Sequence, residues 1–346
     1  MVYRSTLQKP SVWRWKKNFD GRRREMIRTL ILLALLCFGG FGWFESSAKS
    51  EWKNVTRAAE YPLGYNYPVF VVGKRMYAMN NGAWASTDGK SWAKTELPES
   101  GLNSAYQKYV QFNGAVYSLG KMSGNYISFT IEPKILRTRD MKTWEPLSET
   151  SNIPKRIFYG LTVFNGKIWM LGGFDGKRYH NDIWSSADGV RWKVESKAAA
   201  WSPRNISSIV VFNGKIWILG GGVIDGEMNT NPGSDKEIWT SVDGRVWEKL
   251  DAPMIQTLAG TPVVFNDKLL LVGANRGETF ESAVLMTSDG KDWRKLSAPW
   301  SPRGGVAAWN FGGKLFMTGG KSSHTENGEI KFVYSNDVWS LDTLPK

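Results

Sequence analysis

The chain has 346 residues, of which 45 are Lys or Arg and 32 are Asp or Glu, so its formal net charge is +13. Residues 1–48 hold nine of the basic and three of the acidic residues, which leaves 36 against 29 and a net charge of +7 for the remainder. Because much of the basic excess belongs to that segment, we do not expect nucleic-acid binding. Cys37 is the single cysteine, so disulfides, Cys-ligated zinc and thiol catalysis are excluded for the chain that follows it.

The N-terminal segment has the pattern of an export signal. Residues 29–44 carry no charge, Arg28 and the run Arg22-Arg-Arg precede them, and Ser46-Ser-Ala48 supplies small residues for a cut after Ala48. Sixteen helical residues span about 24 Å, less than a hydrocarbon core of about 30 Å, which favours a cleaved signal over an anchor. Two alternatives stay open: translation from Met26, and a short membrane anchor. In each case we expect residues 49–346 to be periplasmic or extracellular.

After this segment a unit with two hairpins recurs. Residues 163–169 and 211–217 both read Val-Phe-Asn-Gly-Lys-Ile-Trp, and Asn-Gly between β-rich runs predicts a type I′ hairpin. The equivalent turns of six copies lie at residues 73–74, 113–114, 165–166, 213–214, 266–267 and 312–313. A second hairpin follows in the first five copies, as in Trp184-Ser-Ser-Ala-Asp-Gly-Val-Arg-Trp192. Four strands in a period of about 40 to 55 residues predict an all-β, six-bladed β-propeller over residues 49–346.

The chain ends indicate how the ring closes. The sixth copy stops before its fourth strand, whereas residues 51–55 resemble the fourth strands of other copies. We therefore expect the N-terminal strand to complete the sixth blade, because a ring otherwise has two unpaired edges at its seam. Each blade then owns one late tryptophan: Trp52, Trp92, Trp144, Trp192, Trp247 and Trp293.

These units resemble the kelch repeat. The resemblance is carried by Phe-Asn-Gly-Lys-Ile-Trp, the double glycine after it, the late Trp, and Asn-Asp-Ile-Trp and Asn-Asp-Val-Trp at residues 181–184 and 336–339. The first copy departs from it with Asn80-Asn81 in place of the double glycine, and the second and fifth keep only Gly120 and Gly273. The Asp-box of sialidase-type propellers fits less well, since its glycine is normally separated from the aspartate.

Alternating strand directions should place the tight turns on one face of the propeller. The longer strand 2–3 loops and the linkers between blades should then share the other face, where recognition usually occurs. Arg156, Arg204 and Arg303 occupy equivalent positions where the first strands of three blades begin, and the other blades have Leu63, Ser104 and Thr257 there. Three guanidinium groups at the channel mouth would suit a carboxylate, a phosphate or an acidic peptide. The alternative is a structural role, in which each arginine pairs with an acidic loop residue.

Other candidates on this face are fewer. Further ligand-binding candidates are Trp201, Trp300, Arg178, Tyr179, His180 and Arg276. His180 and His324 are the only histidines, so we expect no metal site and no cofactor. Asp182 and Asp337 look like turn residues at the start of a strand rather than catalytic carboxylates. The loop charges Asp175, Glu227, Asp235, Glu278 and Glu281 have no partner that the sequence identifies.

Two functions follow from these observations. The first is an exported, monomeric binding module that takes a protein or an anionic glycan at the loop face, with membrane contact only through the N-terminal segment. The second comes from similarity to the N-acetylneuraminate epimerase family, which implies a periplasmic sugar epimerase or mutarotase. That activity needs an anion clamp and a group for proton transfer, although the catalytic residues of the family do not map onto this chain one by one. Galactose-oxidase-like copper chemistry requires a Cys–Tyr crosslink, and the absence of cysteine after Cys37 excludes it.

Overall fold

The computed structural model describes residues 51–97, 102, 107–124, 129–147, 151–221, 237–251, 259–276 and 279–345. The chain divides into two units, residues 1–46 and residues 47–346, and the first lies outside the described residues. The expected signal or anchor at residues 29–44, Met26, Cys37 and the cut after Ala48 are therefore outside them too. Within the described ranges, no helix is long and apolar enough to cross a membrane.

The second unit consists of six antiparallel four-stranded sheets, here called blades 1 to 6. Blade 1 is β2 (Val69–Val72), β3 (Arg75–Met79), β4 (Ala83–Ser86) and β5 (Ala93–Thr95), and blade 2 is β6 (Lys108–Phe112), β7 (Ala115–Gly124), β8 (Phe129–Thr138) and β9 (Glu145–Pro146). Blade 3 is β10 (Gly160–Phe164), β11 (Lys167–Phe174), β12 (Tyr179–Ser186) and β13 (Lys193–Ser196), and blade 4 is β14 (Ile209–Phe212), β15 (Lys215–Leu219), β16 (Ile238–Ser241) and β17 (Glu248–Leu250). Blade 5 is β18 (Ala259–Phe265), β19 (Lys268–Arg276), β20 (Thr279–Thr287) and β21 (Trp293–Ser297), and blade 6 is β22 (Ala307–Phe311), β23 (Lys314–Thr318), β26 (Val338–Leu341) and β1 (Lys53–Thr56).

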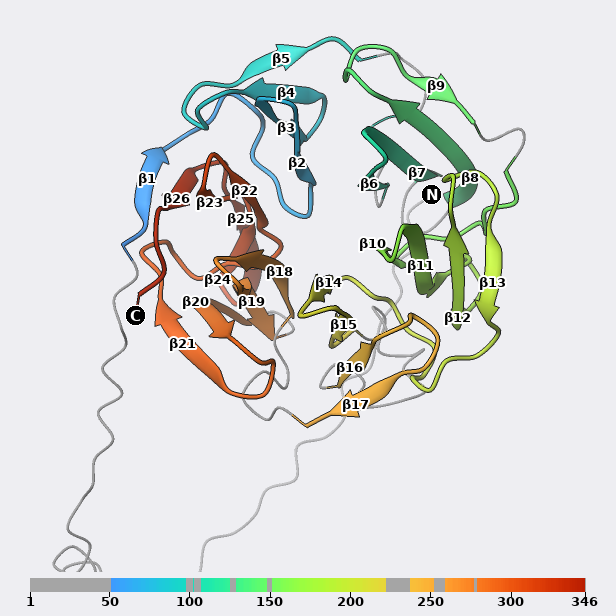
Figure 1. The fold of residues 1–346 in the computed structure, drawn as a ribbon. Helices are drawn as coiled ribbons and strands as arrows, with labels where there is room; N and C mark the ends of the chain where they lie inside the picture. The colour runs from blue at the N-terminus through green and yellow to red at the C-terminus, as the bar shows by residue number, and fades with distance from the viewer. Residues whose placement is uncertain are drawn as a thin grey trace, which may run out of the picture. The chain divides into compact units, whose positions relative to one another are not determined.

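The blades are arranged around a common axis as a six-bladed β-propeller (Figure 1). The first strands of neighbouring blades, such as β10 and β14, contact each other and form the innermost layer. The strand order within each blade follows the two predicted hairpins. The all-β fold and the four antiparallel strands per blade are therefore confirmed.

Blade 6 combines the two ends of the unit. β1 pairs antiparallel with β26, with Lys53 opposite Ser340 and Asn54 opposite Trp339. Trp52, which directly precedes β1, is 8% exposed and packs edge-on against Trp300 with 4.8 Å between ring centroids. An N-terminal strand thus occupies the outer position of a sheet whose other three strands come from the C-terminal end.

Both hairpin types form through local hydrogen bonds and backbone conformations. Asn213 and Gly214 have φ values of 46° and 68°, as a type I′ turn requires. In the second hairpin of blade 3, the hydroxyl of Ser186 accepts the N–H of Gly189 at 2.8 Å. The carboxylate of Asp188 accepts the N–H groups of Val190 and Arg191 at 2.9 and 2.8 Å. This explains why a Ser or Thr two residues before the aspartate recurs in blades 1 to 5.

The blades pack through an aromatic residue on the second strand. Trp217 of β15 lies under Gly290 in the turn of blade 5, where an added Cβ would come within 2.1 Å of the indole ring. Trp169 of β11 has the same relation to Gly244 of blade 4, with a distance of 2.5 Å. The glycine thus provides both the positive φ and the space for the neighbouring ring. The late tryptophans are all buried: Trp52, Trp92, Trp144, Trp192, Trp247 and Trp293.

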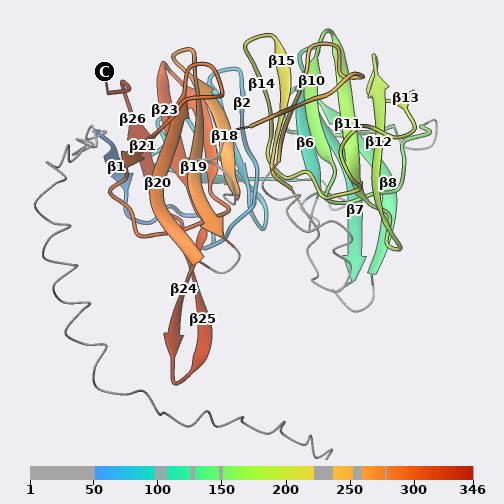
Figure 2. The same ribbon diagram turned by 90° about the horizontal axis from the view of Figure 1, so that it is seen from below.

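One long connection forms a hairpin of its own. The long strand 2–3 connection of blade 6, residues 321–335, contains β24 (Lys321–Glu326) and β25 (Glu329–Tyr334), which pair antiparallel. Asn327 and Gly328 form the turn between them, with φ values of 52° and 81°. The hairpin projects from blade 6 beyond the main sheets (Figure 2). Asn-Gly has here the same turn-forming effect as in the repeats.

The packing of Trp217 makes a prediction that separates crowding from backbone strain. Gly290→Ala and Gly214→Ala both place a side chain at positive φ, but no atom lies within 4 Å of the added Cβ at Gly214. We expect Gly290→Ala to reduce the free energy of unfolding by about 1–3 kcal/mol more than Gly214→Ala, because only the first change also overpacks the core. Urea unfolding followed by Trp fluorescence measures both, and equal losses would contradict the packing account.

Candidate functional site

The propeller has two unlike faces. The face with the Asn-Gly and Asp-Gly turns is here called the turn face, and the face with the strand 2–3 connections and the linkers between blades is called the loop face. On the loop face, the ends of β7 and β8 and the hairpin β24–β25 extend beyond the other blades (Figure 2). The large departures from the repeat among the described residues are thus on the loop face.

Arg156 lies at the start of blade 3, but its guanidinium group already has partners. Nη2 donates to Oδ2 of Asp182 at 2.7 Å, and Nη1 donates to Oδ1 of the same carboxylate and to the carbonyl of Gly172 at 3.1 Å. Only 6% of Arg156 is exposed. Asp182 also accepts the indole N–H of Trp184 at 2.8 Å. Both terminal nitrogens of the arginine are therefore engaged within its own blade.

Arg204 and Arg303 repeat this arrangement in blades 4 and 6. Arg204 is completely buried and donates to Glu237 and to Oγ of Ser202, the latter at 2.7 Å. Arg303, 5% exposed, donates to Asp337 at 2.5 Å. The carboxylates of Glu237 and Asp337 accept the indole N–H groups of the tryptophans two residues later, at 3.1 and 2.8 Å. Burial raises the pKa of Glu237, but hydrogen bonds from Lys249, Arg204 and Trp239 outweigh it and lower that pKa to about 2.

The arginine and its acid occur together or not at all. In blade 1, Leu63 stands at the arginine position and Gly82 at the acid position. In blade 5, the corresponding residues are Thr257 and Ala283. A ligand-binding arginine would not need a carboxylate that neutralises it. The geometry therefore favours the structural role in the blade linker over a convergent anion clamp. Ser104 and Thr257 lie outside the described residues.

Trp201 and Trp300 pack in the core. They are 1% and 3% exposed, and each ring meets a late tryptophan edge-on, Trp201 with Trp247 at 6.1 Å and Trp300 with Trp52 at 4.8 Å between centroids. Neither ring has a face open to a stacked ligand. Their place in the chain, just before the paired arginines, is explained by the linker crossing from one blade to the next.

His180 and Asp175 form the polar pair of the blade 3 loop. Nε2 of His180 lies 2.7 Å from Oδ2 of Asp175, and the two side chains are 15% and 29% exposed. Burial raises the pKa of Asp175, but the N–H groups of Arg178 and Lys177 and the imidazole of His180 outweigh it and lower that pKa to about 2. Asp175 is thus an anion at neutral pH that orients the imidazole. Sequence reasoning identified His180 but not its partner, although Asp175 lies only five residues earlier.

The remaining candidates surround this pair or lie apart from it. The ring of Tyr179 packs on Phe174 with 4.9 Å between centroids, and the side chain of Arg178 is 78% exposed. The backbone of Arg276 belongs to β19, whereas its side chain is outside the described residues, as are Glu227, Asp235 and Glu278. His324 is exposed on β24. Among the described residues, no group of three or more His, Cys, Asp or Glu could hold a metal ion.

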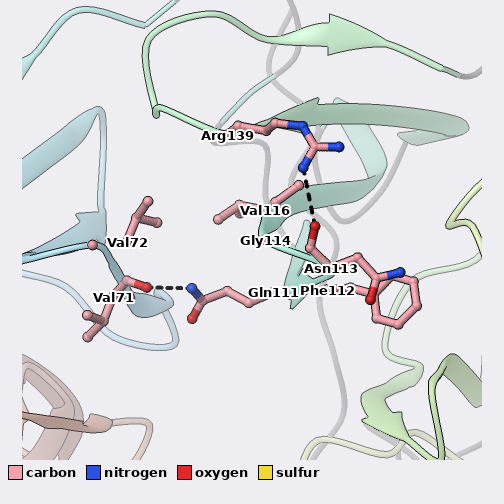
Figure 3. Close-up of a pocket in the computed structure, with 10 residues that line it drawn as sticks. Val71, Val72, Gln111, Phe112, Asn113, Gly114, Val116 and Arg139 are labelled. Carbon is pink, nitrogen blue, oxygen red and sulfur yellow. Dashed lines mark hydrogen bonds between the residues drawn. The ribbon is translucent and has the colours of Figure 1, made fainter.

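A pocket of about 270 Å³ lies between blades 1 and 2 at the turn face (Figure 3). The amide of Gln111 donates to the carbonyl of Val71 across it, and Nη1 of Arg139 donates to the carbonyl of Asn113 at 3.2 Å. The first contact joins the innermost strands β2 and β6 of two blades. The second contact joins the β8–β9 turn of blade 2 to its β6–β7 turn. Gln111 thus joins two blades and Arg139 joins two turns of blade 2, so both polar contacts at the pocket are structural.

Comparison with known proteins supports the fold and no finer assignment. The chain is similar to a solved structure titled "Structure of YjhT", with a TM-score of 0.60 and 14% sequence identity over 81% of this chain and 100% of that one. No protein-family model matches the chain. No curated protein sequence matches it either. The likeness therefore supports a six-bladed β-propeller and leaves the function to the site itself.

The structural role of Arg204 can be tested by substitution. Arg204→Met should lower the free energy of unfolding by about 1–3 kcal/mol, because it removes the buried donor to Glu237 and Ser202 and leaves Glu237 with only Lys249 and Trp239. The double variant Arg204→Met/Glu237→Gln should recover part of this loss. The control Arg178→Met changes an exposed arginine of the same face and should stay within about 0.5 kcal/mol of the parent. Denaturant unfolding measures all three, and a neutral Arg204→Met would support a free, ligand-binding guanidinium group.

Proposed function

We propose that this chain is an exported kelch-type propeller that acts as a binding module, with an anionic glycan or a protein bound at its loop face. One observation carries the proposal: the described elements that exceed the repeat, the ends of β7 and β8 in blade 2 and the hairpin β24–β25 beside blade 6, all extend from this face (Figure 2). A scaffold alone requires no such additions. Extended elements on one face of a rigid ring are the usual form of a recognition surface.

The kelch assignment is supported by the double glycine of blade 3. Gly172 and Gly173 have φ values of 58° and 93°. A Cβ at Gly172 would lie 3.0 Å from the carbonyl oxygens of Arg204 and His180, so the linker to blade 4 passes directly against this glycine. The motif is therefore needed where the chain crosses between blades, which agrees with the place of the double glycine in the repeat.

The N-terminal part of the chain supports export and a closed ring. Residues 29–44 and the basic residues before them have the composition of a signal peptide or a short anchor. We propose that the propeller is periplasmic or extracellular, either released by a cut after Ala48 or held by residues 29–44. The pairing of β1 with β26 supports closure of the ring by the N-terminal strand, since it gives blade 6 its fourth strand.

The charge of the ligand can be argued from what remains exposed. Arg156, Arg204 and Arg303 are buried against acids. Arg178, whose Nε lies 4.0 Å from Oδ2 of Asp175, keeps 78% of its side chain in solvent. The chain after residue 48 also has a net charge of +7, which attracts anionic ligands over a distance of about 10 Å at moderate salt. The ligand that these charges favour is therefore an anion bound at the loop face of blade 3.

Two exposed arginines of blade 3 provide the test. Arg178 lies on the loop face and Arg191 on the turn face, with side chains 78% and 87% exposed. On an array of sialylated and uronic-acid oligosaccharides, Arg178→Glu should weaken binding by about tenfold or more, because it replaces an attraction with a repulsion. Arg191→Glu should leave binding within about twofold. An equal loss for both variants, or no binding by the parent chain, would overturn the proposal.

The second candidate, a sugar mutarotase or epimerase, is favoured by the pair of His180 and Asp175. With Nε2 held by the carboxylate, Nδ1 of His180 is left as the second nitrogen that can take or give a proton. Anomer exchange requires this: a base removes the proton of the anomeric hydroxyl, and an acid delivers one to the ring oxygen as the ring opens.

His324 provides a matched control for this activity. If the chain equilibrates the anomers of an acidic sugar such as N-acetylneuraminate, His180→Gln should reduce the rate by about a hundredfold or more, since general acid–base groups contribute at least that much. His324→Gln, at an exposed site on β24, should retain the full rate. NMR exchange spectroscopy measures the rate directly. A parent chain that gives no acceleration over buffer excludes this candidate and leaves the binding module.

A further inference from the structure

The hairpin β24–β25 concentrates exposed apolar side chains on one strand. In the part of the chain that the structure describes, eight large hydrophobic side chains are exposed, and four of them lie on β25: Ile330, Phe332, Val333 and Tyr334. Their exposed fractions are 48%, 40%, 47% and 37%. The other four are Leu63, Val194 and the two valines Val242 and Val246 of the turn between β16 and β17. The cluster on β25 is thus a feature of the hairpin and not of the surface in general.

The two faces of the hairpin differ in character. Ile330, Phe332 and Tyr334 alternate along β25 and therefore share one face, whereas Glu329 and Lys331 lie on the other. On that other face, Nζ of Lys331 pairs with Glu329 at 2.8 Å. At the base, Tyr334 packs on Tyr65 with 5.6 Å between centroids, which connects the apolar face to the body of the propeller. The hairpin is amphipathic, yet it packs on nothing along most of its length (Figure 2).

The same residues direct their backbone groups toward an open edge. Lys321 exchanges both backbone hydrogen bonds with Gly304, at 2.9 and 3.0 Å, so its N–H and C=O point out of the hairpin. Lys321 and the opposite Tyr334 therefore form a pair without hydrogen bonds inside the hairpin. Because bonded and non-bonded pairs alternate in an antiparallel ladder, Phe332 and Ile330 also belong to non-bonded pairs. The N–H and C=O groups of Ile330, Phe332 and Tyr334 thus all point away from β24. No described residue accepts from or donates to these outward groups on the β25 side. They form a regular edge without a bulge or a proline to protect it.

We propose that this edge is the dimer interface of the protein, where β25 of two copies pair antiparallel about a two-fold axis at Phe332. The two hairpins then form one four-stranded sheet. Phe332 of one copy faces Phe332 of the other, and Ile330 faces Tyr334, so the apolar side chains that are now exposed cover one another. Lys331 comes to lie opposite Val333. This differs from the monomer expected from the sequence.

The charges on β25 select this register and argue for a second copy as the occupant. Outward groups can pair only with outward groups, so two adjacent registers are possible. The one centred on residue 331 sets Lys331 opposite Lys331, and the one centred on residue 333 sets Ile330 opposite Asn336. The register centred on Phe332 avoids like charges and sets Ile330, Phe332 and Tyr334 opposite one another, which makes the edge complementary to itself. The hairpin contact is smaller than the roughly 1,200 Å² of a typical stable interface, so the dimer should dissociate on dilution.

Disulfide trapping in the full chain tests the geometry. Hydrogen-bonded antiparallel pairs have Cα atoms about 5.5 Å apart, which suits a disulfide. With Cys37 changed to Ser, Phe332→Cys should form a crosslinked dimer under mild oxidation. The control His324→Cys places an equally exposed cysteine on the outer strand β24 and should give at most a few per cent of that yield. A crosslink through Lys331→Cys instead of Phe332→Cys, or equal yields from Phe332→Cys and His324→Cys, would overturn the proposed interface.

Sedimentation of the full chain, with every variant in the same mild detergent, tests the association itself. The parent chain should show a concentration-dependent monomer–dimer equilibrium, and Phe332→Lys should weaken it by about tenfold or more, because two charges then meet at the axis. His324→Lys is the matched control and should leave the equilibrium unchanged. An unchanged melting temperature confirms that each variant is folded, since the substituted side chains lie on an exposed hairpin. A parent chain that is monomeric at about 100 μM, or equal dimerisation by the parent and Phe332→Lys, would contradict the proposal.

Discussion

The contact on which the propeller depends is that between an aromatic side chain of one blade and a glycine in the turn of the next. Trp217 under Gly290 and Trp169 under Gly244 are the clearest examples. A four-stranded sheet has two faces, and neither is stable in water unless it is covered. The ring solves this by covering each face with the next blade. The glycine allows the close approach, because its missing side chain leaves the space that the indole ring fills.

This constraint explains why the sequence predicts the fold so well. The turn at Asn213-Gly214, the Ser186–Asp188 turn and the position of Trp247 depend on residues within a few positions of one another, and each recurs in most blades. Local rules therefore determine the hairpins, and repetition determines their number. The hairpin at Asn327-Gly328 follows the same rule and could have been recognised. Repetition does not reveal it, because it is an insertion between strands and has no equivalent in the other blades.

The site was harder to predict, because its pairs connect positions that only the folded blade brings together. Arg156 and Asp182 lie on opposite sides of the first hairpin of blade 3, and the pairing becomes evident only when β11 and β12 are in register. The sequence left both roles of the arginines open, and the contacts favour the structural one. Asp175 and His180 differ in this respect. They are only five residues apart, and a short Asp-Gly turn that places a carboxylate beside a later histidine was a signal present in the sequence.

The distribution of charge follows from the same division between scaffold and loop face. Buried arginine–carboxylate pairs contribute little net stability, but breaking one is costly, so they fix the path of the linker rather than strengthen the ring. Arg204 and Glu237 hold the crossing from blade 3 to blade 4, and the loop with His180 is tied to that crossing, because the N–H of Arg204 donates to the carbonyl of His180 at 3.1 Å. The buried pair of Arg204 and Glu237 thus fixes the backbone next to the partly buried pair of His180 and Asp175. A histidine that transfers a proton or binds a ligand needs such support, since a displacement of its imidazole by about 1 Å is enough to impair a site.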